Sequence, residues 1–120
     1  MRRLAPAVAL MGALASAGAP DAVAEERSFR LAIAATAPAE APVFAVRRGD
    51  AVAITVESAV AGDVHLHGYN REARLQAGGA VSWRFTAHAT GRYPIEFHGP
   101  GEAAGHRHGR ARAYLEVRPR

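Results

Sequence analysis

The chain has 120 residues, enough for one domain, and its formal net charge at pH 7 is only +4. Nucleic-acid binding is disfavoured, because it needs a concentrated basic stripe with stacking aromatics and the arginines here are scattered. The absence of cysteine excludes disulfides, thiolate catalysis, a lipid-modified cysteine and a copper–thiolate centre.

The first 24 residues have the features of an export signal. Met1-Arg2-Arg3 is positively charged, the stretch up to Ala19 is apolar and rich in alanine, and Ala22-Val23-Ala24 fits the small-x-small cleavage pattern. Proline and glycine interrupt the apolar stretch, which is too short for a transmembrane helix. Cleavage of the signal peptide after Ala15-Ser16-Ala17 is the alternative to cleavage after Ala24. We therefore predict a signal peptide over residues 1–24 and a periplasmic or secreted domain over residues 25–120, with no membrane anchor after cleavage.

Four short strands are predicted in the first half of the mature region. Residues 28–35 alternate weakly, residues 43–46 follow a proline-containing break, and residues 51–57 place Val52, Ile54 and Val56 on one face. The fourth segment is Asp63-Val64-His65-Leu66-His67-Gly68-Tyr69-Asn70. Its two histidines are two residues apart, so on a strand they project to the same face.

The second half continues the β pattern. Residues 71–75 are polar and predict an edge strand, and alternation predicts further strands over residues 81–86, 91–97 and 112–118. In the last of these, Ala113, Leu115 and Val117 are expected on one face and the arginines on the other. Glycines at intervals predict a loop over residues 99–109. Seven or eight short strands without a sustained helical period predict an all-β Greek-key sandwich or barrel.

Four features in this order resemble a cupredoxin domain over roughly residues 28–118. They are a proline-led strand ending in Gly-Asp before an apolar strand (42–52), a histidine soon afterwards (His65 or His67), a Gly-x-Tyr-x-Ile-x-Phe strand (91–97), and a histidine-containing loop before a closing strand with Leu-x-Val. The His-x-His-Gly-Tyr-Asn segment is similar to that of small exported cupredoxin-like proteins. The resemblance implies a Greek-key β-sandwich of the cupredoxin type with seven to eight strands.

The chain departs from the blue-copper members of that family where their ligands lie. Their cysteine position, at the end of the penultimate strand, falls on Phe97. Both methionines, Met1 and Met11, lie in the predicted signal peptide. Because the copper–thiolate bond gives the blue centre its electronic properties, the resemblance does not extend to electron transfer.

The histidines predict a different kind of metal site, since imidazole is a usual ligand of Cu(II) and Zn(II). We predict that His65 and His67 take the place of the family's upstream ligand, and that one or two of His98, His106 and His108 take the place of the downstream one. Copper is favoured over zinc by the Irving–Williams order. Asp63 and Glu102 are candidate partners that would orient an imidazole. The predicted function is sequestration or delivery of the metal, with an unidentified protein as its source or acceptor.

The alternative is a metal-free cupredoxin-like module with a structural or protein-interaction role, whose histidines are exposed or hydrogen-bonded. Tyr69 is expected at the core or its rim, and His88 away from the site. Ser28, Ser58 and Ser82 stand in no nucleophile-and-base motif, and no paired carboxylates stand out. We therefore predict that the protein is not an enzyme.

Overall fold

The structure is a computed structural model that describes residue 12, residues 23–99 and residues 110–120. These residues form eight strands and confirm the all-β prediction. In chain order they are β1 (Glu26–Ile33), β2 (Val43–Arg47), β3 (Ala51–Ser58), β4 (Gly62–Leu66), β5 (Arg71–Leu75), β6 (Ala80–Thr86), β7 (Gly91–His98) and β8 (Arg110–Arg118). Among them is no helix of the length and apolar character needed to cross a membrane.

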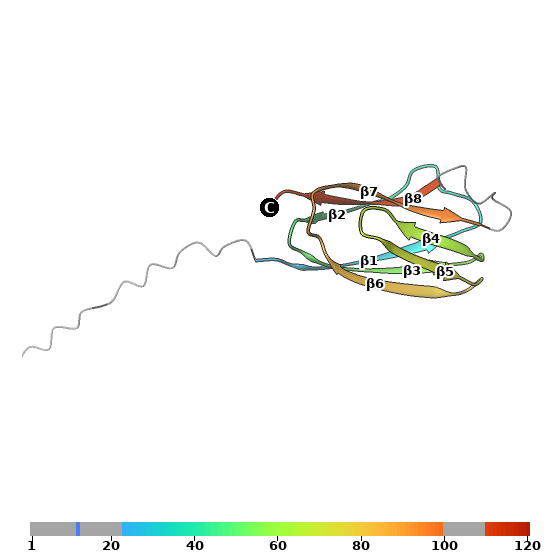
Figure 1. Cartoon of the computed structure of the whole chain (residues 1–120), viewed down its shortest axis with the longest axis horizontal. Helices are drawn as coiled ribbons and strands as arrows, with labels where there is room; N and C mark the ends of the chain where they lie inside the picture. The colour runs from blue at the N-terminus through green and yellow to red at the C-terminus, as the bar shows by residue number, and fades with distance from the viewer. Residues whose placement is uncertain (1–11, 13–22, 100–109) are drawn as a thin grey trace, which may run out of the picture.

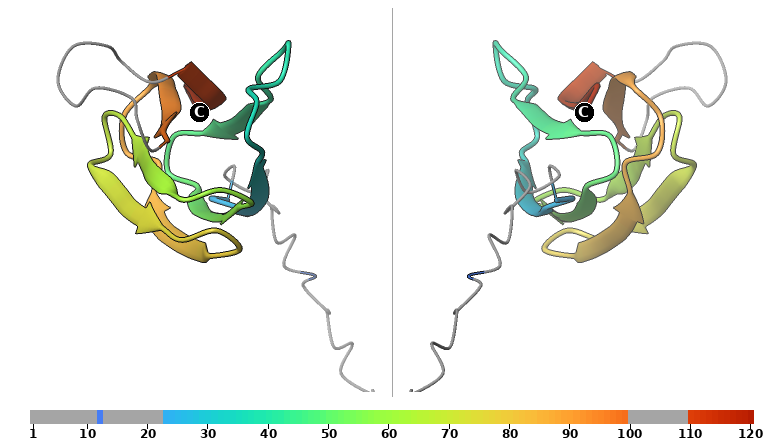
Figure 2. Two further views of the ribbon diagram at one scale, coloured as in Figure 1. Left: turned by 90° about the vertical axis from the view of Figure 1, so that its right-hand side faces the viewer. Right: turned by 90° about the vertical axis from the view of Figure 1, so that its left-hand side faces the viewer.

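The strands form two sheets that face each other (Figure 1). One has the order β1-β3-β6 and the other has the order β2-β8-β7-β4-β5. β1 and β3 pair in parallel, as do β2 and β8, and the remaining neighbours are antiparallel. Figure 2, which looks roughly along the strands, shows the two sheets curving around a common interior. β5 is an edge strand, as its polar sequence predicts.

The core fills this interior with the alternate apolar residues of each strand. Val52, Ile54 and Val56 of β3 are at most 2% exposed, as their alternation predicts. Across the interior, Val64 and Leu66 of β4 are fully buried. On one side of the sandwich the edge strands β1 and β2 are joined by the stacked rings of Phe29 and Phe44, whose centroids lie 4.7 Å apart. β5 and β6 follow each other along the chain and connect the two sheets.

One arginine of β8 does not face outward as its alternation predicts. The register between β7 and β8 shifts at Ile95/Glu96, so that Ile95 pairs with Ala113 and Glu96 with Ala111. Arg112 lies at this bulge and is only 8% exposed. Its Nη1 donates to the Ala34 carbonyl at 2.8 Å, and its guanidinium carbon lies 5.3 Å from the centre of the Phe97 ring. The extra residue of a bulge breaks the alternation, which is why the period-two pattern fails here.

Candidate functional site

The two histidines of the His-x-His segment lie together, as their spacing predicts. Val64 and Leu66 point into the core, so His65 between them points to the outer face of the five-stranded sheet. His67 follows at the first position of the turn after β4, and its amide donates to the Pro94 carbonyl of β7 at 3.1 Å. The ring centroids of His65 and His67 are 4.2 Å apart, with the planes tilted by 59°.

Each imidazole faces a glutamate from a neighbouring strand. The register places His65 opposite Glu72 of β5 on one side and Glu96 of β7 on the other. Nε2 of His65 lies 3.4 Å from a carboxylate oxygen of Glu72, and Nε2 of His67 lies 2.9 Å from Oε2 of Glu96. An ionised carboxylate can only accept, so His67 donates this hydrogen bond through Nε2. We call His65, His67, Glu72 and Glu96 the histidine face.

The two glutamates differ in burial. The Glu72 side chain is 71% exposed, whereas the Glu96 side chain is 10% exposed. A surface pair contributes little and is screened by salt, while a buried carboxylate must be held by hydrogen bonds. Glu96 is therefore the acid that fixes the geometry of the histidine face. The sequence analysis did not select it, although strand alternation puts Glu96 on the same face of β7 as His98.

His98 lies at the other end of this strand pair. It is the last residue of β7 and pairs with Asp63 near the start of β4, beside the Asp63–Arg74 ion pair. His67 is level with Pro94, four residues earlier on β7, which corresponds to about 13 Å along a strand. His65 lies between these levels, and both His65 and His98 line one open groove of ≈ 480 Å³.

Only part of the predicted ligand set lies within the described residues. His106, His108 and Glu102 lie outside the described residues. Among the described residues, no three side chains of the His, Cys, Asp and Glu types are grouped so as to hold a metal ion. Asp63 contacts Arg74 at 3.0 Å, which is a salt bridge on the sheet surface. The five-histidine site therefore stays a prediction.

The turn after β4 is fixed on its inner side by aromatic packing. Gly68 has a φ of +80°, and a Cβ there would lie 2.3 Å from a ring carbon of Tyr93. Tyr69 is 8% exposed and packs against Phe85, His88 and Tyr93. Its hydroxyl donates to the Ala89 carbonyl at 3.0 Å, and burial raises its pKa. Tyr69 is a core aromatic that anchors the turn, as expected.

No protein-family model and no curated protein matches the chain. Solved structures, by contrast, do match the chain. A blue copper oxidase from Nitrosomonas europaea matches with a TM-score of 0.54 at 18% identity, over 78% of this chain and 39% of that chain. A copper-containing nitrite reductase from Thermus scotoductus SA-01 matches with a TM-score of 0.56 at 22% identity, over 78% of this chain and 28% of that chain.

A heme-copper terminal oxidase dimer also matches, with a TM-score of 0.54 at 21% identity over 73% of this chain and 60% of that chain. The chain thus spans less than two thirds of the length of each of these proteins. At such identities the likeness shows the fold alone. The chain has a cupredoxin-like fold, as its sequence features predict.

Proposed function

We propose that this chain is an exported cupredoxin-like protein that binds a divalent transition metal through histidines, with copper favoured over zinc. His65 and His67 would supply the first two ligands, and one or two of His98, His106 and His108 would complete the site. The role would be sequestration or delivery of the ion. The chain carries neither cysteine nor a methionine beyond residue 11, so blue-copper electron transfer is not part of the proposal.

The observation that carries the proposal is the His67–Glu96 contact beside the His65 ring. Histidines that bind metals usually donate their other ring nitrogen to a carboxylate, which fixes the ring and raises its basicity as a ligand. Nε2 of His67 is held in this way at 2.9 Å by a buried glutamate. The ion would then bind through Nδ1. A bound Cu(II) would supply a strong charge centre there, and the chain's own groups orient the two rings.

We also infer that the protein binds rather than catalyses. The likeness to copper enzymes covers a fraction of each of those chains and concerns the fold alone. The sequence offers no nucleophile with an adjacent base. Export is supported by the signal-like features of residues 1–24.

A titration of the purified protein with Cu(II), followed by calorimetry and EPR, tests the proposal. We expect one tight site per chain, lost when His65→Ala and His67→Ala are combined. His88→Ala is the matched control, because His88 is exposed and its Nδ1 lies 3.3 Å from the carbonyl oxygen of the nearby Thr86, away from the histidine face. Tight binding that survives in the double variant would contradict the site.

The second candidate is a metal-free cupredoxin-like module that supports structure or protein interaction. The fact that favours it is that both Nε2 atoms already lie close to carboxylate oxygens, so each imidazole has a polar partner within the protein without an ion. This candidate predicts no one-to-one Cu(II) binding by the wild-type protein and no copper in protein purified from its host.

A further inference from the structure

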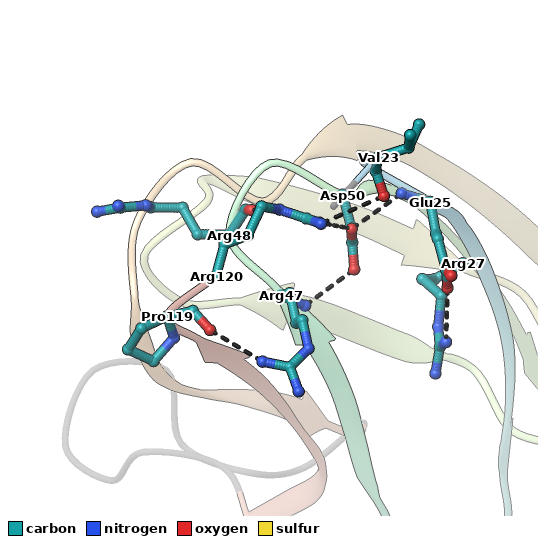
Figure 3. Close-up of polar contacts among 8 residues, drawn as sticks. All are labelled: Val23, Glu25, Arg27, Arg47, Arg48, Asp50, Pro119 and Arg120. Carbon is teal, nitrogen blue, oxygen red and sulfur yellow. Dashed lines mark hydrogen bonds and ion pairs between the residues drawn. The ribbon is translucent and has the colours of Figure 1, made fainter. Parts of the chain in front are cut away.

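A second buried acid lies where the first strand begins and the chain ends (Figure 3). Asp50, 4% exposed, precedes β3. Its Oδ2 accepts from the Arg47 amide at 2.9 Å, and its Oδ1 accepts from the Glu25 amide at 3.1 Å and pairs with the Arg120 guanidinium. Burial raises the pKa of Asp50, but the two amides and Arg120 outweigh it, so the pKa lies below its ordinary value.

The backbone of Glu25 is held in this position from both sides. Its carbonyl accepts from the Ala51 amide at 3.0 Å, and the next residue, Glu26, already pairs with Ala51 in the β1–β3 ladder. These contacts fix the carbonyl of Glu25 and so keep its amide nitrogen within reach of the Asp50 carboxylate. Glu25 is also the first residue after the predicted cleavage point, Ala22-Val23-Ala24.

We propose that cleavage between Ala24 and Glu25 converts this amide into an α-ammonium group that forms an ion pair with the buried carboxylate of Asp50. The peptidase adds one water across the bond. Its oxygen and one hydrogen complete the carboxyl group of Ala24, and the other hydrogen goes to the nitrogen of Glu25, which takes up a further proton from solvent. A neutral donor with one hydrogen thereby becomes a cation with three. Processing itself strengthens the polar contact that joins β1 to β3.

The other charges at this end leave the carboxylate available to the ammonium. A cavity of ≈ 440 Å³ here is lined by Val23, Glu25, Arg27, Ala45, Val46, Arg47, Asp50, Arg118 and Arg120. Arg27 pairs with the Glu25 side chain, Arg47 donates to the Pro119 carbonyl, and Arg118 pairs with Glu116.

Among the described residues, Arg120 is then the cation that shares Asp50 with the ammonium. It also donates to the Arg48 carbonyl at 2.9 Å, a contact that cleavage leaves in place. Cleavage removes Val23, whose carbonyl accepts from Arg120 at 3.2 Å. Because Val23 is 74% exposed, its loss uncovers little of the core.

The composition of the chain makes this contact measurable. All 15 lysine and arginine positions of these 120 residues are arginine, so a processed chain of this sequence carries its α-amine without any lysine amine beside it. The full chain would be exported from a bacterial host, its starting residue determined by mass, and its acylation rate by an N-hydroxysuccinimide ester measured at about pH 8. Only the unprotonated amine reacts, and once its pKa lies above the pH of the assay each further unit of pKa increase lowers the unprotonated population by nearly tenfold. We expect native protein to react at least about tenfold more slowly than urea-unfolded protein.

Two variants test whether the slow acylation of the α-amine depends on its contact with Asp50. Asp50→Asn should bring the native rate toward the unfolded one, whereas Glu57→Gln, which removes an exposed carboxylate of β3, should not. A glutamate inserted between Ala24 and Glu25 moves the amine one residue away with Asp50 intact, and it should also restore the fast rate. Equal native and unfolded rates in the wild type, an unchanged rate in the inserted variant, or a processed chain that does not begin at Glu25 would overturn the proposal.

Discussion

Asp50 and Glu96 are the two buried acids of the described chain, and their partners differ in kind. Asp50 accepts hydrogen bonds from two backbone amides and pairs with a guanidinium, and one of these amides is the group that cleavage would convert into an α-ammonium. Glu96 faces the imidazole of His67, a group that can release a proton or bind an ion. A buried carboxylate therefore holds backbone at one end of the sandwich and orients an imidazole on the histidine face.

The largest effect is expected at the turn that presents His67 to Glu96. Gly68→Ala combines a positive φ with a Cβ that would lie 2.3 Å from the Tyr93 ring, so we expect a loss of about 3 kcal/mol in the free energy of unfolding. Gly78→Ala is the matched control, since its φ is +81° and nothing lies within 4 Å of the added Cβ. It should lose about 1 kcal/mol. Equal losses in urea unfolding would show that the Tyr93 contact does not restrict the turn.

Removal of the charge on Asp50 is expected to have the next largest effect. Asp50→Asn weakens three hydrogen bonds to a carboxylate and leaves Arg120 without its anion, which should lower the free energy of unfolding by about 2 kcal/mol at neutral pH. Glu57→Gln, an exposed acid on the same strand, should change it by less than about 0.5 kcal/mol. Urea unfolding monitored by Trp83 fluorescence measures both.

The same carboxylate gives a pH dependence with a definite sign. The pKa of Asp50 is lowered in the folded protein, so its stabilisation is fully present above the unfolded value, near 3.8, and is lost as pH falls through the lower folded value. The stability difference between wild type and Asp50→Asn should therefore be constant between about pH 5 and about pH 7 and shrink below about pH 4. A difference that persists unchanged at acid pH would assign it to another group.

Glu96→Gln should have the smallest effect on stability and a clear effect on binding. Glutamine keeps an acceptor for His67 and fills the same volume, so we expect a change of less than about 1 kcal/mol in unfolding. Loss of the carboxylate that orients a ligand typically lowers metal affinity 10- to 100-fold, so Cu(II) affinity should fall within about that range. Glu72→Gln, at an exposed position of the same face, is the control and should lower affinity less.

The strands were predictable because most of them bury every second residue. β3 and β4 have this pattern, and the inward residues of β3 were assigned correctly from the sequence. The burial of Arg112 was not predicted, because the bulge that buries it depends on the register between β7 and β8. Glu96 was missed for a related reason. An outward glutamate normally faces solvent, and its burial on the outer face of the central strand β7 depends on how neighbouring elements cover it. Local sequence carries no signal for such three-dimensional effects.

The most direct test of the histidine face is imidazole ¹⁵N NMR of the protein with and without one equivalent of Zn(II), a diamagnetic probe of the same ligands. We expect Nδ1 of His65 and His67 to shift on binding, Nε2 of His67 to remain protonated toward Glu96, and His88 to stay unchanged. Shifts confined to other histidines, or no shift at a saturating ratio, would contradict the assignment of the metal site to this face.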